Sequence, residues 1–218
     1  MPRSKTYSMA STSSPSELIR TYARANSVVV YKTKETFGGL SNMAAGFPLH
    51  INGTRILTTE ALYQACRFPT LPDVQREIIA QHSPMTAKMK SKPHRQNTRP
   101  DWEEVRFKVM RWCLRVKLAQ HYSDFGRLLL ATRDRPIVEQ SRKDDYWGAL
   151  VGVDDDTLSG QNVLGRLLME LRERLKQDAE HDLLHVEPLA IPDFMLFGSP
   201  IESIHGREPA ASRVTQLF

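Results

Sequence analysis

A hairpin signal that runs directly into a capped helix constrains the fold of this chain more than any other stretch. Asn52-Gly53 separates two short runs that contain apolar residues, 47–51 and 54–57, and this arrangement is the strongest short-range signal for a β-hairpin. Residues 58–68 follow at once and read Thr-Thr-Glu-Ala-Leu-Tyr-Gln-Ala-Cys-Arg-Phe. Threonine is a favourable N-cap, and the rest is compatible with a helix. We therefore expect the hairpin to hold this helix in a defined position.

One face of the predicted helix is polar. On a period of 3.6 residues, that face presents Glu60, Tyr63, Gln64 and Arg67. An acid, a phenol, an amide and a guanidinium together can bind a polar ligand and exchange protons with it. A carboxylate in the first turn also stabilises a helix through its dipole. Glu60 alone therefore does not decide between a binding site and simple helix stabilisation, and we interpret the whole face as a candidate site.

The composition indicates a single globular domain with tails. The chain has 218 residues, of which 40% are hydrophobic and 25% are charged, as in ordinary soluble domains. The net charge of +5 weakly favours an anionic partner. Residues 6–15 are polar, so we expect no signal peptide, and no run approaches the ~18 apolar residues of a membrane span. Cys66 and Cys113 lie among apolar residues, and we expect buried free thiols in a cytoplasmic protein.

The pattern of the remaining chain predicts a compact, mostly helical α+β fold with a small sheet. Residues 101–120 are apolar on two sides, so this helix is expected to be central. Further helices are predicted at 72–79, from Pro84 onwards, 123–132 and 163–176, strands at 27–32 and 136–139, and a polar loop at 91–99. We expect a tail with a short docking helix at residues 1–26, a catalytic domain at 27–177 and a C-terminal extension without clear periodicity at 178–218.

Residues 144–148 read Asp-Asp-Tyr-Trp-Gly and follow a predicted strand directly. At such a junction Asp145 can bind ribose hydroxyls or exchange protons, Trp147 can stack on a base, and Gly148 lets the backbone approach a ligand closely. A surface turn with a packed tryptophan explains the spacing equally well.

The start of the last predicted helix is a second candidate motif, Gly-Gln-Asn-Val-Leu-Gly-Arg at residues 160–166. Helix N-termini can hold phosphate, and Asn162 is a natural N-cap. A capped helix with a solvated Arg166 is the simpler explanation of this stretch alone.

A lysine at the end of the first strand is a third candidate. If Lys32 is partly desolvated, it can act as a neutral amine in Schiff-base chemistry, with Asn42 of the following glycine loop nearby. A lysine in this position is more often a solvated charge. Basic residues are dense from Lys88 to Arg115, and the loop before Trp102 is the better candidate for contacting phosphates.

Together these motifs resemble the NADAR family, which includes YbiA-like members. The similarity spans residues 28–177 and rests on motifs in a fixed order: Tyr-Lys at 31–32, Gly-Leu-Ser-Asn at 39–42, Thr-Glu-Ala-Leu-Tyr-Gln-Ala at 59–65, Ser-Pro at 83–84 with the lysine at 88, Asp-Trp at 101–102, Leu-Leu-Leu-Ala-Thr at 128–132, Asp-Tyr-Trp-Gly at 145–148, and the segment 160–172.

The resemblance implies a compact α+β domain that cleaves N-glycosidic bonds. Some NADAR members remove ADP-ribose from guanine bases in DNA and so reverse the action of ADP-ribosyltransferase toxins. YbiA-like members hydrolyse early intermediates of riboflavin synthesis. The implied partners are ADP-ribosylated DNA or ADP-ribose and a cognate toxin, with no membrane and no cofactor, and no cluster with metal-ligand spacing is visible in the sequence.

The resemblance also implies roles for individual residues. The catalytic set is Lys32, Glu60 and Asp145, with Lys88 as the reserve candidate for the lysine that forms an imine. Ala61 stands where many members have histidine. The expected substrate-binding residues are Asn42, Tyr63, Gln64, Lys88, Trp102, Trp147, Gly148, Asn162 and Arg166.

Several hypotheses follow. The leading one is a hydrolase that frees guanine in DNA from ADP-ribose as an antitoxin, favoured by the lysine at position 32. The same chemistry on a riboflavin intermediate is the alternative, and it needs no basic loop at residues 88–99. A non-catalytic binder of ADP-ribose or nucleic acid is a third hypothesis. A direct antitoxin contact through the apolar residues 194–197 is a fourth, although packing of that strip on its own domain is the simpler expectation.

Overall fold

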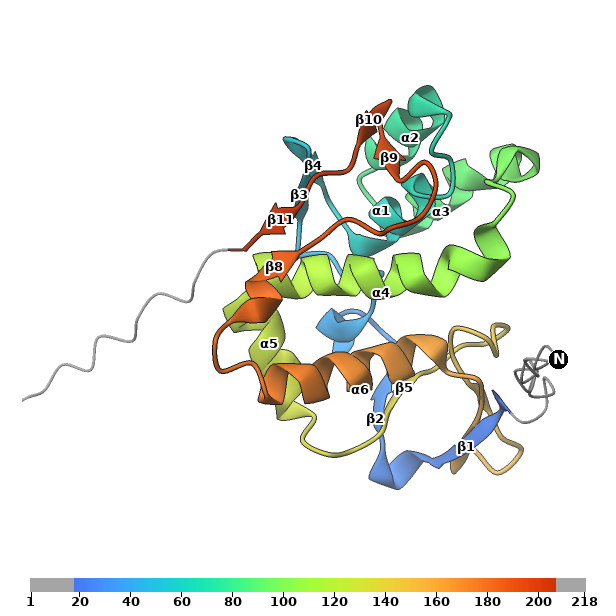
Figure 1. Cartoon of the computed structure of the whole chain (residues 1–218). Helices are drawn as coiled ribbons and strands as arrows, with labels where there is room; N and C mark the ends of the chain where they lie inside the picture. The colour runs from blue at the N-terminus through green and yellow to red at the C-terminus, as the bar shows by residue number, and fades with distance from the viewer. Residues whose placement is uncertain (1–17, 207–218) are drawn as a thin grey trace, which may run out of the picture.

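The computed structural model describes residues 18–206, and helix α4 (Trp102–Gln120) lies at its centre (Figure 1). Helices α1 (Thr59–Ala65), α5 (Tyr122–Ala131) and α6 (Val163–Lys176) all contact α4. Most of the α4 side chains are buried on more than one side of the helix, which confirms the predicted central helix. The fold is α+β, as predicted.

The predicted hairpin is present. Strands β3 (Leu49–Ile51) and β4 (Thr54–Ile56) pair in antiparallel orientation. Asn52 and Gly53 between them have φ angles of 47° and 73°, which is the left-handed backbone that a type I′ turn requires. The Thr58 hydroxyl accepts a hydrogen bond from the backbone N–H of Ala61 at 3.2 Å and so caps α1. The hairpin thus leads directly into the helix that contains Glu60.

Helices α2 (Pro72–Ile79) and α3 (Pro84–Ser91) contact α1 and each other. Both begin at a proline, as predicted, because the missing N–H of proline is not needed in the first turn. The following segment was expected to be a loop and instead forms the 3₁₀ helix η4 (Lys92–Asn97). Its short-range hydrogen bonds need only local contacts, so this polar stretch is ordered without an apolar face.

A small sheet of two parallel strands supports the other side of the molecule. Strand β2 (Val28–Val30) pairs with β5 (Ile137–Glu139), and β5 contacts α6. The short 3₁₀ helices η2 (Arg24–Asn26) and η3 (Gly38–Leu40) flank β2 in the chain. Both strands were predicted from their β-branched composition.

The prediction of a docking helix near the N-terminus is wrong where the structure describes the chain, because that segment contains a strand. Residues Arg20–Ala23 form strand β1, which pairs with β7 (Thr157–Gly160), and β7 pairs with β6 (Leu150–Val151). Tyr22 is the one buried residue of β1 and packs with a small second apolar cluster around Val138. Pairing with β7 therefore overrides the weak helical pattern. Residues 1–17 of the predicted tail lie outside the described part of the chain.

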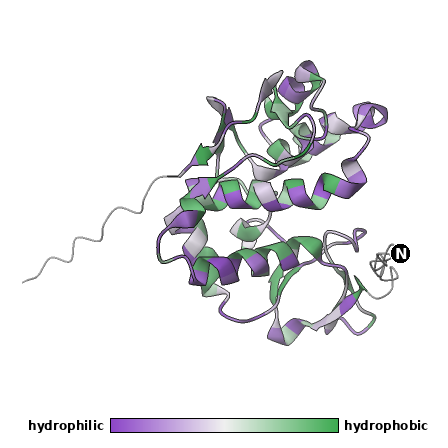
Figure 2. Cartoon of the chain, in the orientation of Figure 1, coloured by the Kyte–Doolittle hydropathy of each residue, from purple (hydrophilic) through white to green (hydrophobic). Residues whose placement is uncertain are grey.

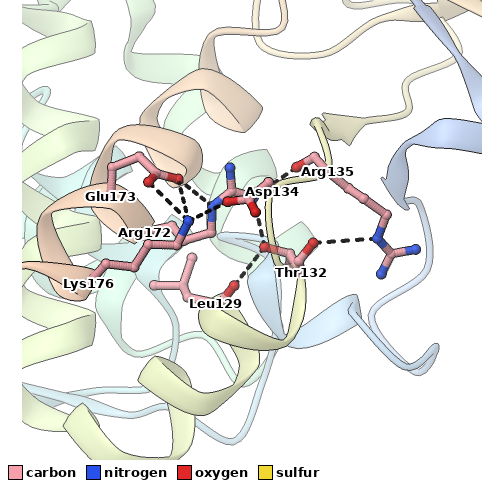
Figure 3. A network of polar contacts seen from close by, with 7 residues as sticks. All are labelled: Leu129, Thr132, Asp134, Arg135, Arg172, Glu173 and Lys176. Atoms are coloured by element: carbon pink, nitrogen blue, oxygen red, sulfur yellow. Dashed lines mark hydrogen bonds and ion pairs between the residues drawn. The ribbon is translucent and has the colours of Figure 1, made fainter.

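A polar network anchors the segment that leads into β5 (Figure 3). The buried Arg172 of α6 donates hydrogen bonds to the Thr132 hydroxyl at 2.9 Å and to the Arg135 carbonyl at 2.8 Å. Lys176, one turn later, forms ion pairs with Asp134 at 2.6 Å and with Glu173 at 3.0 Å. In Figure 2 hydrophobic and hydrophilic residues alternate along α6, as expected of an amphipathic helix. Helix α6 thereby fixes β5 against the core.

The segment after α6 folds onto the domain. It contains η5 (Asp182–Leu184) and two strand pairs, β8 (His185–Val186) with β11 (Ile204–His205) and β9 (Met195–Leu196) with β10 (Ser199–Pro200). Phe194 and Leu196 are buried, and the Phe194 ring packs edge-on against Trp112 with centroids 4.8 Å apart. The apolar strip therefore packs on its own domain, which was the simpler of the two expectations.

Two further expectations concern the cysteines and membrane-spanning segments. Cys66 and Cys113 are buried and unbonded, as predicted. No helix within residues 18–206 combines the length and the apolar character needed to cross a bilayer.

Candidate active site

A cavity of about 340 Å³ lies between α1, α3, α4 and the loop that follows β5. It brings together a large part of the predicted set: Asn42, Glu60, Tyr63, Gln64, Lys88, Trp102, Trp147 and Gly148. Other residues of the stretches singled out in the sequence also line it: Arg67 of the polar helix face, Arg95 and Arg106 of the basic stretch, and Asp144 and Leu164 of the two later motifs. No motif indicated the rest of the lining: Met43, Glu103, Met110, Glu139, Gln140 and Ser141.

Glu60 is almost completely buried, with 2% of its surface exposed. The side-chain amide of Asn42 donates to Oε2 of Glu60, and that of Gln64 donates to Oε1 at 2.9 Å. The backbone N–H of Glu60 also donates to the Asn42 carbonyl at 3.0 Å. Two amide donors therefore fix the orientation of a carboxyl group at the wall of the cavity.

Burial raises the pKa of Glu60 from 4.5 to about 7, although the nearby charge of Lys88 and the hydrogen bond from Gln64 act in the opposite direction. A carboxyl group with a pKa near neutrality is present in both protonation states at physiological pH. This is the property that a general acid or base needs, and it occurs here inside a cavity.

A second carboxyl group, Glu139, lies at the end of β5 and lines the same cavity. The Ser41 hydroxyl donates to Oε1 of Glu139 at 3.3 Å. Burial is the largest cause that raises the pKa of Glu139 from 4.5 to about 8. The sequence predicted the strand but gave no reason to single out its last residue.

A buried lysine, Lys117, holds the loop whose Ser41 and Asn42 side chains donate to Glu139 and Glu60. Lys117 of α4 is completely buried and donates to the carbonyl oxygens of Gly39 at 2.6 Å and Ser41 at 3.2 Å. The rings of Phe47 and Phe125 lie 4.5 and 4.4 Å from its ammonium nitrogen. Burial lowers its pKa from 10.5 to about 7, partly opposed by the charge of Glu139. Lys117 therefore positions the loop that presents Ser41 and, next to it, Asn42.

Three aromatic rings form one wall of the cavity. The ring of Tyr63 lies 5.1 Å from that of Trp102 and 5.6 Å from that of Trp147, centroid to centroid. Burial raises the pKa of Tyr63, so its hydroxyl stays protonated. Aromatic faces of this kind bind planar heterocycles by stacking.

Cationic side chains line another part of the cavity. The Arg67 guanidinium lies 5.1 Å from the Trp102 ring and donates through Nε to the Thr98 hydroxyl at 3.1 Å. Arg106 lies 3.8 Å from the Tyr146 ring and forms an ion pair with Glu103 at 3.1 Å. With Lys88 and Arg95 in addition, this region is suited to a phosphate group.

Part of the basic stretch predicted to contact phosphates instead contacts acidic side chains of the protein itself. Lys90 forms an ion pair with Glu77 at 2.8 Å, and His94 lies 3.6 Å from the same carboxylate. Arg99 is buried and pairs with Asp101 at 2.6 Å. These side chains satisfy internal contacts, so they add little to an exposed basic surface.

The loop after β5 presents Asp144 to the cavity, whereas Asp145 is exposed and does not line it. Asp144 accepts hydrogen bonds from the backbone N–H groups of Tyr146 at 3.2 Å and Trp147 at 2.9 Å. A Cβ atom on Gly148 would lie 2.5 Å from the Glu139 carbonyl oxygen. The glycine therefore permits a close approach to β5 rather than only to a ligand.

The structure places Asn162, Arg166 and Lys32 outside the cavity lining. Asn162 is fully buried and bonds to β5, accepting from the Glu139 N–H at 3.0 Å and donating to the Ile137 carbonyl at 2.9 Å. Its side chain does not cap α6, contrary to expectation, because its left-handed backbone turns the amide towards the strand. The Lys32 side chain is 70% exposed, 4.0 Å from Glu35.

The first two N–H groups of α6, those of Val163 and Leu164, already have acceptors within the protein and are not open to a phosphate. The backbone N–H groups of residues 161–164 donate to the carbonyl oxygens of residues 145–148. This arrangement fastens the Trp147 loop to the helix and explains why the two motifs occur together. Within residues 18–206, no group of three or more histidine, cysteine or acidic side chains is arranged to hold a metal ion.

Comparison with known proteins decides the family. The NADAR domain family model matches residues 21–176, most of the chain. The chain belongs to the NADAR family. N-glycosidase YbiA of Escherichia coli strain K12 is 40% identical over 146 residues, which cover 66% of this chain and 86% of that protein. N-glycosidase Npun_R5314 of Nostoc punctiforme is 31% identical over 151 residues, 68% of this chain and 92% of that protein.

The chain is also similar to part of a larger protein. Riboflavin biosynthesis protein VVA0006 of Vibrio vulnificus is 30% identical over 200 residues, which are 88% of this chain but 52% of that protein. The NMR structure of Escherichia coli YbiA matches with a TM-score of 0.58 and 33% identity, covering 72% of this chain and 92% of that chain. The fold described above is therefore that of a NADAR domain.

Proposed function

We propose that this protein is an N-glycosidase that hydrolyses the bond between ribose and nitrogen in a small phosphorylated N-ribosyl compound. The observation that supports this most directly is Glu60, a buried carboxyl group with a pKa near 7 on the wall of a cavity. Breaking a bond from C1 of ribose to nitrogen develops positive charge on the sugar, and a carboxylate beside C1 stabilises that charge.

The lining of the cavity supports this class of substrate. The Trp102 and Trp147 rings offer stacking surfaces for the base, and Arg67 with its cationic neighbours offers a phosphate subsite. A volume of about 340 Å³ is at the lower end of the ~300–1,000 Å³ of small-molecule sites. We therefore favour a single ribosyl base with one phosphate over a dinucleotide-sized ligand.

The names of the relatives also support an N-glycosidase that acts on a small substrate. Of the three relatives described above, two are named N-glycosidases and one is named a riboflavin biosynthesis protein. We therefore favour an early intermediate of riboflavin synthesis, a ribosylamino pyrimidine phosphate, as the substrate.

The proposed reaction needs only water and carboxyl chemistry. The electron pair of the broken C1–N bond stays on nitrogen, which takes a proton from a carboxylic acid. Water adds to C1 and loses one proton to a carboxylate, a role that we give to Glu60. The products are the free ribose phosphate and the amine. The acid has then lost one proton and Glu60 has gained one, and proton exchange with solvent restores both groups.

Removal of ADP-ribose from guanine in DNA is a second candidate. The observation that favours it is Lys88, which lines the cavity and is therefore better placed than Lys32 to attack C1 and form an imine. The internal ion pairs of Lys90 and the buried Arg99 leave less of the basic segment for contacts with DNA.

A panel of substrates separates these candidates. The wild-type protein is incubated in parallel with a ribosylamino pyrimidine 5′-phosphate, with its dephosphorylated form, and with single-stranded DNA that contains ADP-ribosylated guanine. We expect release of ribose 5-phosphate from the first, with a much lower kcat/KM for the second. Release of ADP-ribose from DNA alone would favour the second candidate, and binding without release would indicate a non-catalytic binder.

The imine step has a separate test. Borohydride is added during turnover of the ADP-ribosylated substrate, and adducts are mapped by mass spectrometry. An adduct on Lys88 that disappears in Lys88→Ala but persists in Lys32→Ala is expected if the second candidate is correct. An adduct on Lys32 would return the catalytic role to the lysine that the family resemblance first indicated.

A further inference from the structure

Glu139 is a further acidic residue of the cavity wall, and its surroundings indicate a chemical role. Glu139 is the last residue of β5, and its position is fixed by the backbone: its N–H donates to the Asn162 side chain at 3.0 Å, and its carbonyl accepts from Ala149 at 2.8 Å. Strand pairing with Val30 adds a further restraint. The carboxyl group is therefore presented to the cavity from a rigid element, as a reacting group requires.

One oxygen of this carboxyl group lacks a hydrogen-bond partner. Oε1 accepts from the Ser41 hydroxyl at 3.3 Å, whereas Oε2 is buried and has no partner within residues 18–206. Buried polar atoms are nearly always satisfied, and an exception needs an explanation. Because Glu139 lines the cavity, a group of a bound substrate is the natural partner of Oε2.

Glu60 and Glu139, two acidic residues of the cavity wall, differ in their surroundings. Glu60 accepts from two amides, those of Asn42 and Gln64, which favour its ionised form. Glu139 accepts from one hydroxyl, so its ionised form is less well stabilised. Different environments for paired carboxyl groups are what separate an acid from a base in one site.

The charged groups around Glu139 agree with this difference. It faces Lys117 of α4, Glu60 of α1 and Asp144 of the following loop. Its pKa is raised to about 8, mainly by burial and also by the charges of the two carboxylates, while the Ser41 hydroxyl and the charge of Lys117 act in the opposite direction. Ser41 and Asn42 are consecutive residues of one loop. The Ser41 hydroxyl donates to Glu139, and the Asn42 amide donates to Glu60.

We propose that Glu139 is the acid that protonates the departing nitrogen, while Glu60 is the carboxylate that takes the proton of water; this assignment rests on the proposed function. As the C1–N bond breaks, its electron pair remains on nitrogen, which receives the proton from Oε2 of Glu139. Water adds to C1 and passes a proton to Glu60. Proton exchange with solvent then returns both carboxyl groups to their starting states, with no oxidant or other reactant required.

The test is a comparison of Glu139→Gln with wild type on two ribose 5-phosphate N-glycosides. One glycoside releases a basic amine, and the other releases a nitro-substituted aryl amine that needs little protonation. We expect kcat/KM to fall about 10²–10⁴-fold for the first and less than about tenfold for the second. The alkaline limb of the pH profile should also disappear. Glu104→Gln, an exposed residue of α4 outside the cavity, is the matched control and should behave as wild type.

A second variant keeps the test decisive if Glu139→Gln does not fold. Ser41→Ala removes the hydroxyl that stabilises ionised Glu139, so the alkaline limb should move to higher pH. Equal losses of Glu139→Gln on both glycosides, or an unmoved limb in Ser41→Ala, would overturn the assignment and leave the proposed function standing. Absence of hydrolysis by wild type on every N-ribosyl substrate would overturn the proposed function, and the assignment with it.

Discussion

Replacing Glu60 by glutamine should make the protein more stable while removing its activity. The folded protein holds a proton on Glu60 more tightly than the unfolded chain does, because burial raises the pKa from 4.5 to about 7. Below pH 4.5 the carboxyl group is protonated in both states and costs nothing. Between pH 4.5 and 7 the unfolded chain ionises first, so the stability of wild type falls as the pH rises.

The magnitude follows from that difference. Each pKa unit corresponds to about 1.4 kcal/mol, so the buried carboxyl group costs the folded state about 3 kcal/mol at pH 7 and above. In Glu60→Gln this cost is absent. Asn42 and Gln64 both donate to Glu60, and one of them then faces an amide N–H, which returns about 1 kcal/mol. The net gain at pH 8 is about 2 kcal/mol.

Urea unfolding of both proteins at pH 5 and pH 8 measures this effect. The loss of one hydrogen bond does not depend on pH, so the change between the two conditions isolates the carboxyl group. We expect the free energy of unfolding of Glu60→Gln, relative to wild type, to rise by about 2 kcal/mol from pH 5 to pH 8. A difference that is the same at both pH values would refute the reasoning, because Glu60 would then be ionised like an exposed glutamate.

Three further outcomes are expected. Asn42→Ala removes a donor to the ionised form of Glu60, so the acidic limb of the pH–rate profile should move to higher pH; an unmoved limb would assign that limb to another group. Arg67→Gln should raise KM about tenfold for a phosphorylated substrate, as loss of one charge-assisted hydrogen bond predicts, with little change for the dephosphorylated form. In Lys117→Met two core carbonyl groups lose their donor, and the free energy of unfolding should fall by about 1–3 kcal/mol. Because the pKa of Lys117 is lowered from 10.5 to about 7 in the folded protein, the unfolded chain takes up this proton first, and wild type loses stability as the pH falls from 10.5 to about 7. Urea unfolding should therefore show the full deficit of Lys117→Met only at the alkaline end of this window.

Local sequence signals were sufficient where the structure depends on local contacts. The type I′ turn at Asn52 and the capped helix that follows need only neighbouring residues, and both form as expected. The central position of residues 101–120 was predicted from apolar side chains on two sides of the helix, and most of these side chains are buried. The motifs around Glu60, Trp102 and Trp147 were recognised by residue type, and the structure brings them into one cavity.

The remaining features depend on contacts between distant segments. Glu139 ends an apolar strand, and only the approach of the Ser41 loop turns it into part of the cavity. Lys117 lies in a helix pattern that does not distinguish a buried ammonium from a solvated one. Asn162 looked like a helix cap, but it bonds across to β5. Residues Arg20–Ala23 become a strand because β7 offers them a partner.

The most direct test of the central claim measures binding and turnover together in Glu60→Gln. Substrate affinity is determined by calorimetry, and release of ribose 5-phosphate from the ribosylamino pyrimidine phosphate is followed under single-turnover conditions. We expect binding within a few-fold of wild type and a rate lowered by at least about 10²-fold, since glutamine fills the same space but cannot exchange protons. Turnover by Glu60→Gln at the wild-type rate would contradict the claim that the buried carboxyl group does the chemistry.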